Sequence, residues 1–159
     1  MASRLLDFPG EDLLSQVKLL KGTAESMSAG SGQVILDFLE YLGKTSPIAV
    51  QEEYTRTFDL DPSLCLNLTF HKWGENKKRN SALAEFKKTY RDAGFEVCGE
   101  ELPDYLPIVL EFLSVCPEES CLPIYDEYGE QMTLVASRLR EMQSPYAGLA
   151  ETLCSAWRR

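Results

Sequence analysis

The stretch Glu101-Leu-Pro-Asp-Tyr-Leu-Pro-Ile-Val-Leu-Glu-Phe-Leu113 decides the fold class, because a proline-punctuated acidic loop turns into a helix within it. Asp104 is a favourable N-cap residue, since its carboxylate can accept a hydrogen bond from a free backbone N–H of the first helical turn. Pro107 then falls in that turn, where the missing N–H of a proline costs nothing. Apolar residues follow from Leu106 at positions i, i+4 and i+7, which predicts a buried helical face. We therefore expect polar groups at the mouth of a buried helix.

The same helical periodicity extends along the rest of the chain, and no segment of useful length alternates with the period of two that a strand requires. Local signals set the boundaries: Ser46 is a capping residue before a proline, whereas Gly43, Gly74 and Gly94 are typical helix ends. A flexible break is expected over residues 28–32. The segments predicted to be helical are 3–8, 11–28, 34–42, 47–58, 64–73, 76–94, 104–115, 122–142 and 144–157. The prediction is an all-α fold of about eight or nine helices, in a single globular domain over residues 1–159.

The net charge of the chain indicates which classes of partner it can bind. The net charge is −9 and the sequence pI is about 4.7. An acidic chain does not neutralise phosphates, so nucleic acid and anionic membrane surfaces are not expected partners, whereas a basic peptide is favoured. The apolar runs fall short of the roughly 20 residues that span a bilayer, and no signal-peptide core precedes the first acid. We expect a cytoplasmic protein that does not insert into a membrane.

Catalytic and metal-binding signals are weak. The five cysteines include no Cys-x-x-Cys pair, so a disulfide framework is not expected. Cys116 and Cys121 bracket a proline and fit a redox pair, half a metal site, or reduced thiols packed as small apolar groups, of which the last is the simplest. The single histidine is His71, and no glycine-rich phosphate loop is present. We predict no catalytic residue, no metal site and no cofactor.

Three further segments admit both a structural and a functional interpretation. Tyr54 and Phe58 lie one helical turn apart and precede Asp59, which fits either core packing or an aromatic-walled pocket rimmed by acids. In the segment 66–73, an apolar stripe faces the core and leaves His71 available to a partner. The basic first turn formed by Lys77, Lys78 and Arg79 opposes the helix dipole, so it is either a retained contact or a solvated face.

Four short motifs follow one another from Tyr54 onward. They are Tyr54-x-x-x-Phe58-Asp59-Leu60, Leu66-x-Leu68-Thr69-x-His71-x-x-Gly74, Lys78-Arg79-x-x-Ala82-Leu83-x-x-Phe86-x-x-x-Tyr90-x-x-x-Gly94-Phe95-Glu96 and Glu101-Leu102-Pro103-Asp104-x-Leu106-Pro107-x-Val109-Leu110-Glu111-Phe112. In this order and spacing they resemble the NarJ family, the nitrate reductase delta-subunit chaperones within the TorD/DmsD group of redox-enzyme maturation proteins. Residues 5–9 also resemble the opening helix of that family. The chain departs from the family pattern at Asn80, where glycine is frequent, and at Tyr105, where many members have histidine.

The resemblance implies an all-helical, TorD-like chaperone domain without catalytic activity. Such chaperones bind the N-terminal segment of the apo catalytic subunit of a molybdoenzyme, here the nitrate reductase alpha subunit. They keep the subunit competent for insertion of the molybdenum cofactor and delay its membrane docking. Asp59 and Asp104 would pair with a partner Arg or Lys, and aromatic side chains would form an apolar wall. By motif position the peptide-binding residues are Tyr54, Phe58, Asp59, His71, Glu101, Asp104, Tyr105, Pro107 and Glu111.

Two alternatives from other functional classes stay open at the level of sequence. One is a nucleotide-binding or small-molecule-binding regulator built on the same helical scaffold. The other is a thiol-redox regulator that uses Cys116 and Cys121. The client is also open, because related molybdoenzymes of selenate, chlorate or hydrocarbon metabolism use similar chaperones.

Overall fold

Every regular segment of the computed structural model, which describes residues 1–27 and 29–157, is helical. Within these residues there are ten α-helices, one π-helical segment and no strand, apart from an isolated bridge between Asn67 and Tyr105. The prediction of an all-α fold is confirmed. The elements are α1 (Ala2–Leu5), α2 (Glu11–Ser15), α3 (Val17–Glu25), α4 (Ala29–Lys44), α5 (Pro47–Tyr54), η1 (Thr55–Asp59), α6 (Leu68–Trp73), α7 (Lys78–Asp92), α8 (Leu106–Val115), α9 (Glu118–Glu141) and α10 (Ala147–Trp157).

Several boundaries follow their local signals. The Ser46 hydroxyl accepts a hydrogen bond from the backbone N–H of Ala49 at 3.4 Å, and Pro47 opens α5. Gly74 has a φ of 53° just after α6, and its N–H reaches the carbonyl of Phe70 at 2.7 Å. A left-handed φ of this kind favours glycine, so the predicted end of this helix is confirmed for the stated reason.

Other boundaries differ from the sequence prediction. The segment 11–28 is split at Gln16 into α2 and α3, so the part of the chain that the structure describes holds ten α-helices rather than eight or nine. Helix α4 begins at Ala29 and continues through Gly43, which is therefore not a stop, and Ser28 lies outside the described residues. The predicted helix 64–73 begins only at Leu68, because Asp61 instead accepts a hydrogen bond from the N–H of Ser63 and forms a turn.

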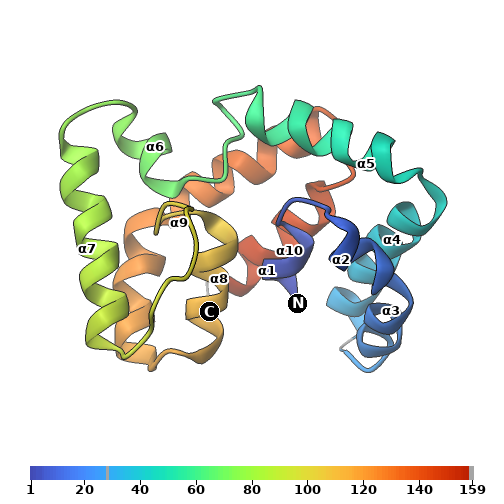
Figure 1. The fold of residues 1–159 in the computed structure, drawn as a ribbon, viewed down its shortest axis with the longest axis horizontal. Coiled ribbons are helices and arrows are strands. Elements are labelled where there is room, and N and C mark those ends of the chain that lie inside the picture. Colours follow the sequence, from blue (N-terminus) through green and yellow to red (C-terminus); the bar gives the residue numbers. More distant parts are fainter. Residues whose placement is uncertain (28, 158–159) are drawn as a thin grey trace.

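The longest helix, α9, packs along α10 through the middle of the molecule, with α7 at one side and the α3–α4 pair at the other (Figure 1). Helix α1 packs against α8, and α6 contacts both α7 and α9. Buried side chains from α1 through α10 form one apolar cluster. Aromatic rings contribute much of it, as in the contact between Phe58 and Tyr146, whose ring centroids are 4.9 Å apart. In the described part of the chain, no helix combines the length and apolar character that crossing a bilayer requires.

A disulfide joins Cys116, which caps the end of α8, to Cys121 in the second turn of α9, with a Cα–Cα distance of 6.6 Å. The interpretation of these two residues as reduced, separately packed thiols is therefore wrong. Their spacing of five residues brings them together because only Cys116 and Pro117 separate the end of α8 from the start of α9.

Candidate functional site

A cavity of about 320 Å³ lies where the chain segments around residues 7, 54–59, 65–67 and 101–105 meet. Five of the nine residues predicted to bind a peptide line it: Tyr54, Phe58, Asp59, Glu101 and Tyr105. We call it the Tyr54–Tyr105 cavity. The aromatic-walled, acid-rimmed pocket is thus the arrangement that the structure shows, although Tyr54 and Phe58 are also core residues with 3% of their surface exposed.

A π-helical turn builds the first wall of the cavity. Helix α5 passes into η1, where the N–H of Leu60 bonds the carbonyl of Thr55 at 3.0 Å in an i→i+5 pattern. Tyr54 and Phe58 stay in contact across this turn, with ring centroids 4.9 Å apart. Asp59 closes the turn and is exposed at the rim. Single π turns inserted into α-helices are frequent at functional sites.

A short backbone pairing builds the second wall. The N–H of Leu106 bonds the carbonyl of Leu66 at 2.8 Å, and the N–H of Leu68 bonds the carbonyl of Asp104 at 3.1 Å. The Tyr90 hydroxyl donates to the carbonyl of Pro103 at 2.6 Å and fixes the same loop from α7. Residues from three of the four sequence motifs therefore hold one another in place behind the cavity.

Asp104 is wholly buried, and its carboxylate holds the two loops together. It accepts hydrogen bonds from the Asn67 amide at 3.0 Å, from the Thr69 backbone N–H at 3.0 Å and from the Thr69 hydroxyl at 2.5 Å. The Arg79 guanidinium lies 4.0 Å away and donates to the Thr69 hydroxyl at 3.1 Å. Arg79 is thus a retained contact of the basic first turn.

The prediction that Asp104 caps its own helix is wrong. Helix α8 has Tyr105 at its N-cap position and no side-chain cap. Thr69 is instead in the first turn of α6, so Asp104 caps a helix that begins 36 residues earlier in the chain. Tertiary contacts override the local signal because the buried carboxylate finds three donors there. Pro107 does fall in the first turn of α8, as predicted.

Tyr105 ties the cavity to the N-terminal segment. Its hydroxyl donates to the Asp7 carboxylate at 3.0 Å and lies 2.8 Å from the Tyr54 hydroxyl, which is itself 3.2 Å from the carbonyl of Leu6. Burial raises the pKa of Tyr105 far above the usual tyrosine value, and Tyr54 and Asp7 act in the same direction. The hydroxyl of Tyr105 therefore stays protonated at neutral pH.

The charge of the cavity is of one sign. Asp7, Asp59 and Glu101 are exposed at its rim, and no basic residue is among those that line it. Burial raises the pKa of Tyr54, the hydrogen bond with Tyr105 lowers it, and the carboxylates of all three acids raise it, as expected for a hydroxyl near three negative charges. In residues 1–27 and 29–157, no group of three or more His, Cys, Asp or Glu side chains is placed to hold a metal ion.

The remaining predicted residues lie outside the cavity. His71 is half-buried and its Nε2 lies 2.6 Å from the carbonyl of Cys65, a lining residue, so Nε2 carries the proton and donates. Burial lowers the pKa of His71. Pro107 is buried in α8, whereas Glu111 is exposed on a separate hollow beside α1. Cys116 and Cys121 are not among the lining residues.

Sequence reasoning missed half of the lining: Asp7, Phe8, Cys65, Leu66 and Asn67. A signal existed for two of them, since Asp7 and Phe8 lie in the N-terminal stretch that resembles the family's opening helix. Phe8 packs edge-on against Tyr54 at 5.5 Å yet is 46% exposed. Leu60 and Leu102, next in sequence to rim acids, are 72% and 40% exposed. Apolar surface therefore borders the acidic rim.

Comparison with known proteins places this geometry in context. The profile of a family described as "Nitrate reductase delta subunit" matches residues 24–151. The chain is 32% identical over 157 residues to the probable nitrate reductase molybdenum cofactor assembly chaperone NarJ of Bacillus subtilis, covering 97% of this chain and 84% of that protein. It is 28% identical over 156 residues to the nitrate reductase molybdenum cofactor assembly chaperone NarJ of Escherichia coli K12, covering 96% of this chain and 66% of that protein. A match of 29% identity to the nitrate reductase-like protein NarX of Mycobacterium tuberculosis H37Rv covers 96% of this chain but 23% of that protein.

Proposed function

The chain belongs to the nitrate reductase delta subunit family, and from that premise we propose that it is an assembly chaperone for a respiratory nitrate reductase. Its client is the apo catalytic subunit, whose N-terminal segment it binds until the molybdenum cofactor has been inserted. It acts in the cytoplasm as one domain over residues 1–159 and releases the subunit before membrane docking. It binds and does not catalyse.

One observation carries this proposal: the Tyr54–Tyr105 cavity is aromatic inside, acidic at its rim and free of lining basic residues. Aromatic faces and carboxylates together attract a cation that has an apolar stem, which describes an arginine or lysine side chain. The net charge of −9 steers a basic segment toward the protein from a distance. We assign Asp59 and Glu101 to the partner's basic residue, and Tyr54, Phe58 and Tyr105 to its stem.

Exposed apolar side chains beside the rim allow the site to bind a peptide segment and not only one basic side chain. Phe8, Leu60 and Leu102 offer anchors on different sides of the acids. Peptides that bind in this way gain encounter rate from charge and residence time from apolar burial. The buried Asp104 cannot reach a ligand without unfolding its network, so we assign it a positioning role: it holds Asn67 and Tyr105 at the cavity wall.

Calorimetry tests the proposal with a synthetic peptide of about 30 residues from the N-terminus of the nitrate reductase catalytic subunit of the same organism. We expect binding that weakens as salt rises, because exposed charge pairs are screened. Asp59→Lys should weaken binding about tenfold, since it replaces an attraction by a repulsion of similar size.

Asp92→Lys is the matched control, because it makes the same change of net charge on an exposed residue that does not line the cavity. It should change the affinity much less than Asp59→Lys. Equal effects of the two variants would mean that only overall charge matters, and the absence of binding at any salt concentration would contradict the proposal.

A further inference from the structure

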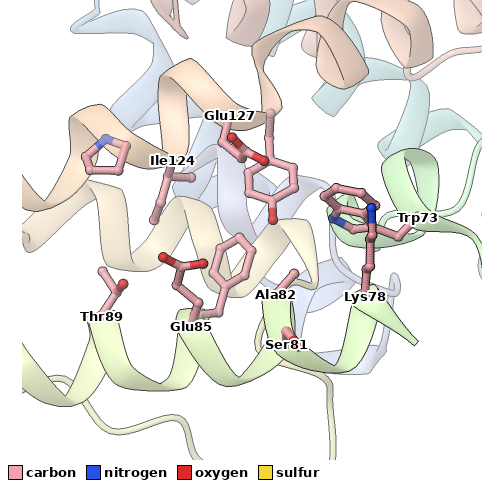
Figure 2. A pocket seen from close by; sticks show the side chains of 11 residues that line it. Trp73, Lys78, Ser81, Ala82, Glu85, Thr89, Ile124 and Glu127 are labelled. Atoms are coloured by element: carbon pink, nitrogen blue, oxygen red, sulfur yellow. The ribbon is translucent and has the colours of Figure 1, made fainter. Parts of the chain in front are cut away.

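A second cavity, of about 370 Å³, lies between α7 and α9 and is closed at one end by Trp73 of α6. Figure 2 shows Glu85 and Ala82 on α7 facing Ile124 and Glu127 on α9 across it. None of its lining residues lines the Tyr54–Tyr105 cavity. The proposed function therefore leaves this cavity without a role.

The floor of the second cavity is apolar. Phe86, Ile124 and Tyr128 form it, each with 4–5% of its surface exposed, and the rings of Phe86 and Tyr128 are in contact with centroids 5.3 Å apart. The Trp73 indole N–H is buried and has no hydrogen-bond partner in the part of the chain that the structure describes. A buried donor without an acceptor is costly, and a ligand oxygen would satisfy it.

The rim is acidic between the two helices. Glu127 pairs with Lys72, whereas Glu85 makes no ion pair in residues 1–27 and 29–157. The face of the Trp73 ring is already occupied, because the Lys72 and Lys78 amines lie 5.4 and 5.5 Å from its centre. Burial raises the pKa of Tyr128 to about 12, and Glu127 and Glu85 both act in that direction, as expected where both carboxylates approach the floor. An incoming cation thus meets its free partner at Glu85.

We propose that this cavity is a second peptide pocket, which takes an apolar side chain of the client segment on the floor and the adjacent Arg or Lys at Glu85. A peptide carbonyl then accepts the Trp73 N–H. Lys78 also lines the cavity, but its amine lies over the Trp73 ring, so the carboxylate of Glu85 favours a cationic over an anionic occupant. The volume falls in the range of small-ligand sites. The identification of the occupant as a client segment rests on the proposed function. The preference of the pocket for an apolar side chain beside a cation does not.

Two probes test separately the ligand preference of the pocket and the identity of its occupant. The first is N-acetyl-leucyl-arginine amide, which carries the proposed pair of side chains, compared with N-acetyl-leucyl-glutamate amide. We expect the arginine compound to shift the NMR signals of residues 81–89 and 124–128, and the glutamate compound to do so much more weakly. Glu85→Lys should weaken binding of the arginine compound at this pocket about fivefold, equivalent to about 1 kcal/mol.

Glu141→Lys is the control, because Glu141 is an exposed α9 residue that is not among the lining residues. Equal shifts from both compounds, or equal affinities in the two variants, would overturn the pocket's chemistry. The second probe is the 30-residue client peptide. Glu85→Lys should lower the affinity for this peptide more than Glu141→Lys does. Equal affinities of the two variants for the peptide would overturn the assignment of the client as occupant. If wild-type protein fails to bind that peptide while the arginine compound binds, the proposed function fails and the pocket stands.

Discussion

Replacing Asp104 with alanine removes the buried carboxylate that joins α6 to the loop before α8. Three donors lose their acceptor at once: the Asn67 amide, the Thr69 N–H and the Thr69 hydroxyl. The Arg79 guanidinium, 20% exposed, also loses its nearby negative charge. An ordinary surface N-cap, the role that the local sequence indicates for Asp104, would cost only about 1 kcal/mol when removed.

The structure requires a larger loss. Hydrogen bonds to a charged group contribute about 1.5–3 kcal/mol each, and they are not additive within one network. Removal of one partner from a buried charged pair costs about 3–5 kcal/mol, and we take that range for Asp104→Ala. It corresponds to a fall in Tm of about 6–20 °C for a protein of this length.

Urea unfolding followed by helical circular dichroism measures this free energy. Asp59→Ala is the control, because Asp59 is exposed and removal of such a side chain changes stability by about 0.5 kcal/mol or less. A loss of about 1 kcal/mol or less for Asp104→Ala would refute the reasoning, since the carboxylate would then behave as a solvated cap.

Three further predictions use other contacts. Tyr105→Phe removes the hydroxyl that donates to Asp7, so we expect a loss of about 1 kcal/mol in urea unfolding; no change would show that this bond does not hold the N-terminal segment. Burial lowers the pKa of His71, so the unfolded chain binds its proton more readily, and wild-type stability should fall as the pH drops below about 6.5. The stability difference between wild type and His71→Gln should then shrink from pH 7.5 to pH 5, and a constant difference in Tm would contradict this. Replacing Cys116 and Cys121 together by serine removes a disulfide between residues five positions apart. The unfolded chain gains entropy, so the free energy of unfolding should fall by about 2 kcal/mol. An unchanged urea midpoint under non-reducing conditions would count against the disulfide.

The sequence predicts elements well where the cause is local. Ser46 with Pro47 begins α5, and Gly74 ends α6, because capping and positive φ depend on a few neighbouring residues. It predicts poorly where a distant group competes. The carboxylate of Asp104 accepts a hydrogen bond from the N–H of Thr69 and does not cap α8. A capping preference depends on neighbouring residues in the sequence, so it cannot predict a partner 35 positions away.

The candidate site shows the same division. The spacing of Tyr54, Phe58 and Asp59 fits either core packing or a pocket wall, and in the structure the two aromatic residues are buried while all three line one cavity. The residue that completes the wall at Tyr105 is Asp7, 98 positions away, and no periodicity relates the two. The π turn over Thr55–Asp59 has no recognised sequence signal either, although it determines where Asp59 emerges.

The second cavity was not predictable from spacing. Phe86 lies on the buried stripe of α7, and Glu85 on its exposed edge, so each fits an ordinary amphipathic helix. Only the approach of α9 and Trp73 turns these two residues into the floor and rim of a pocket. Tertiary packing therefore creates both the space and the unpartnered indole N–H.

The most direct test of the central claim is the molybdenum content of nitrate reductase purified from the same organism with the gene for this chain deleted. The account predicts catalytic subunits that accumulate without molybdenum, restoration by the wild-type chain and by Asp92→Lys, and poor restoration by Asp59→Lys. Catalytic subunits with full molybdenum content in the deletion strain would contradict the account.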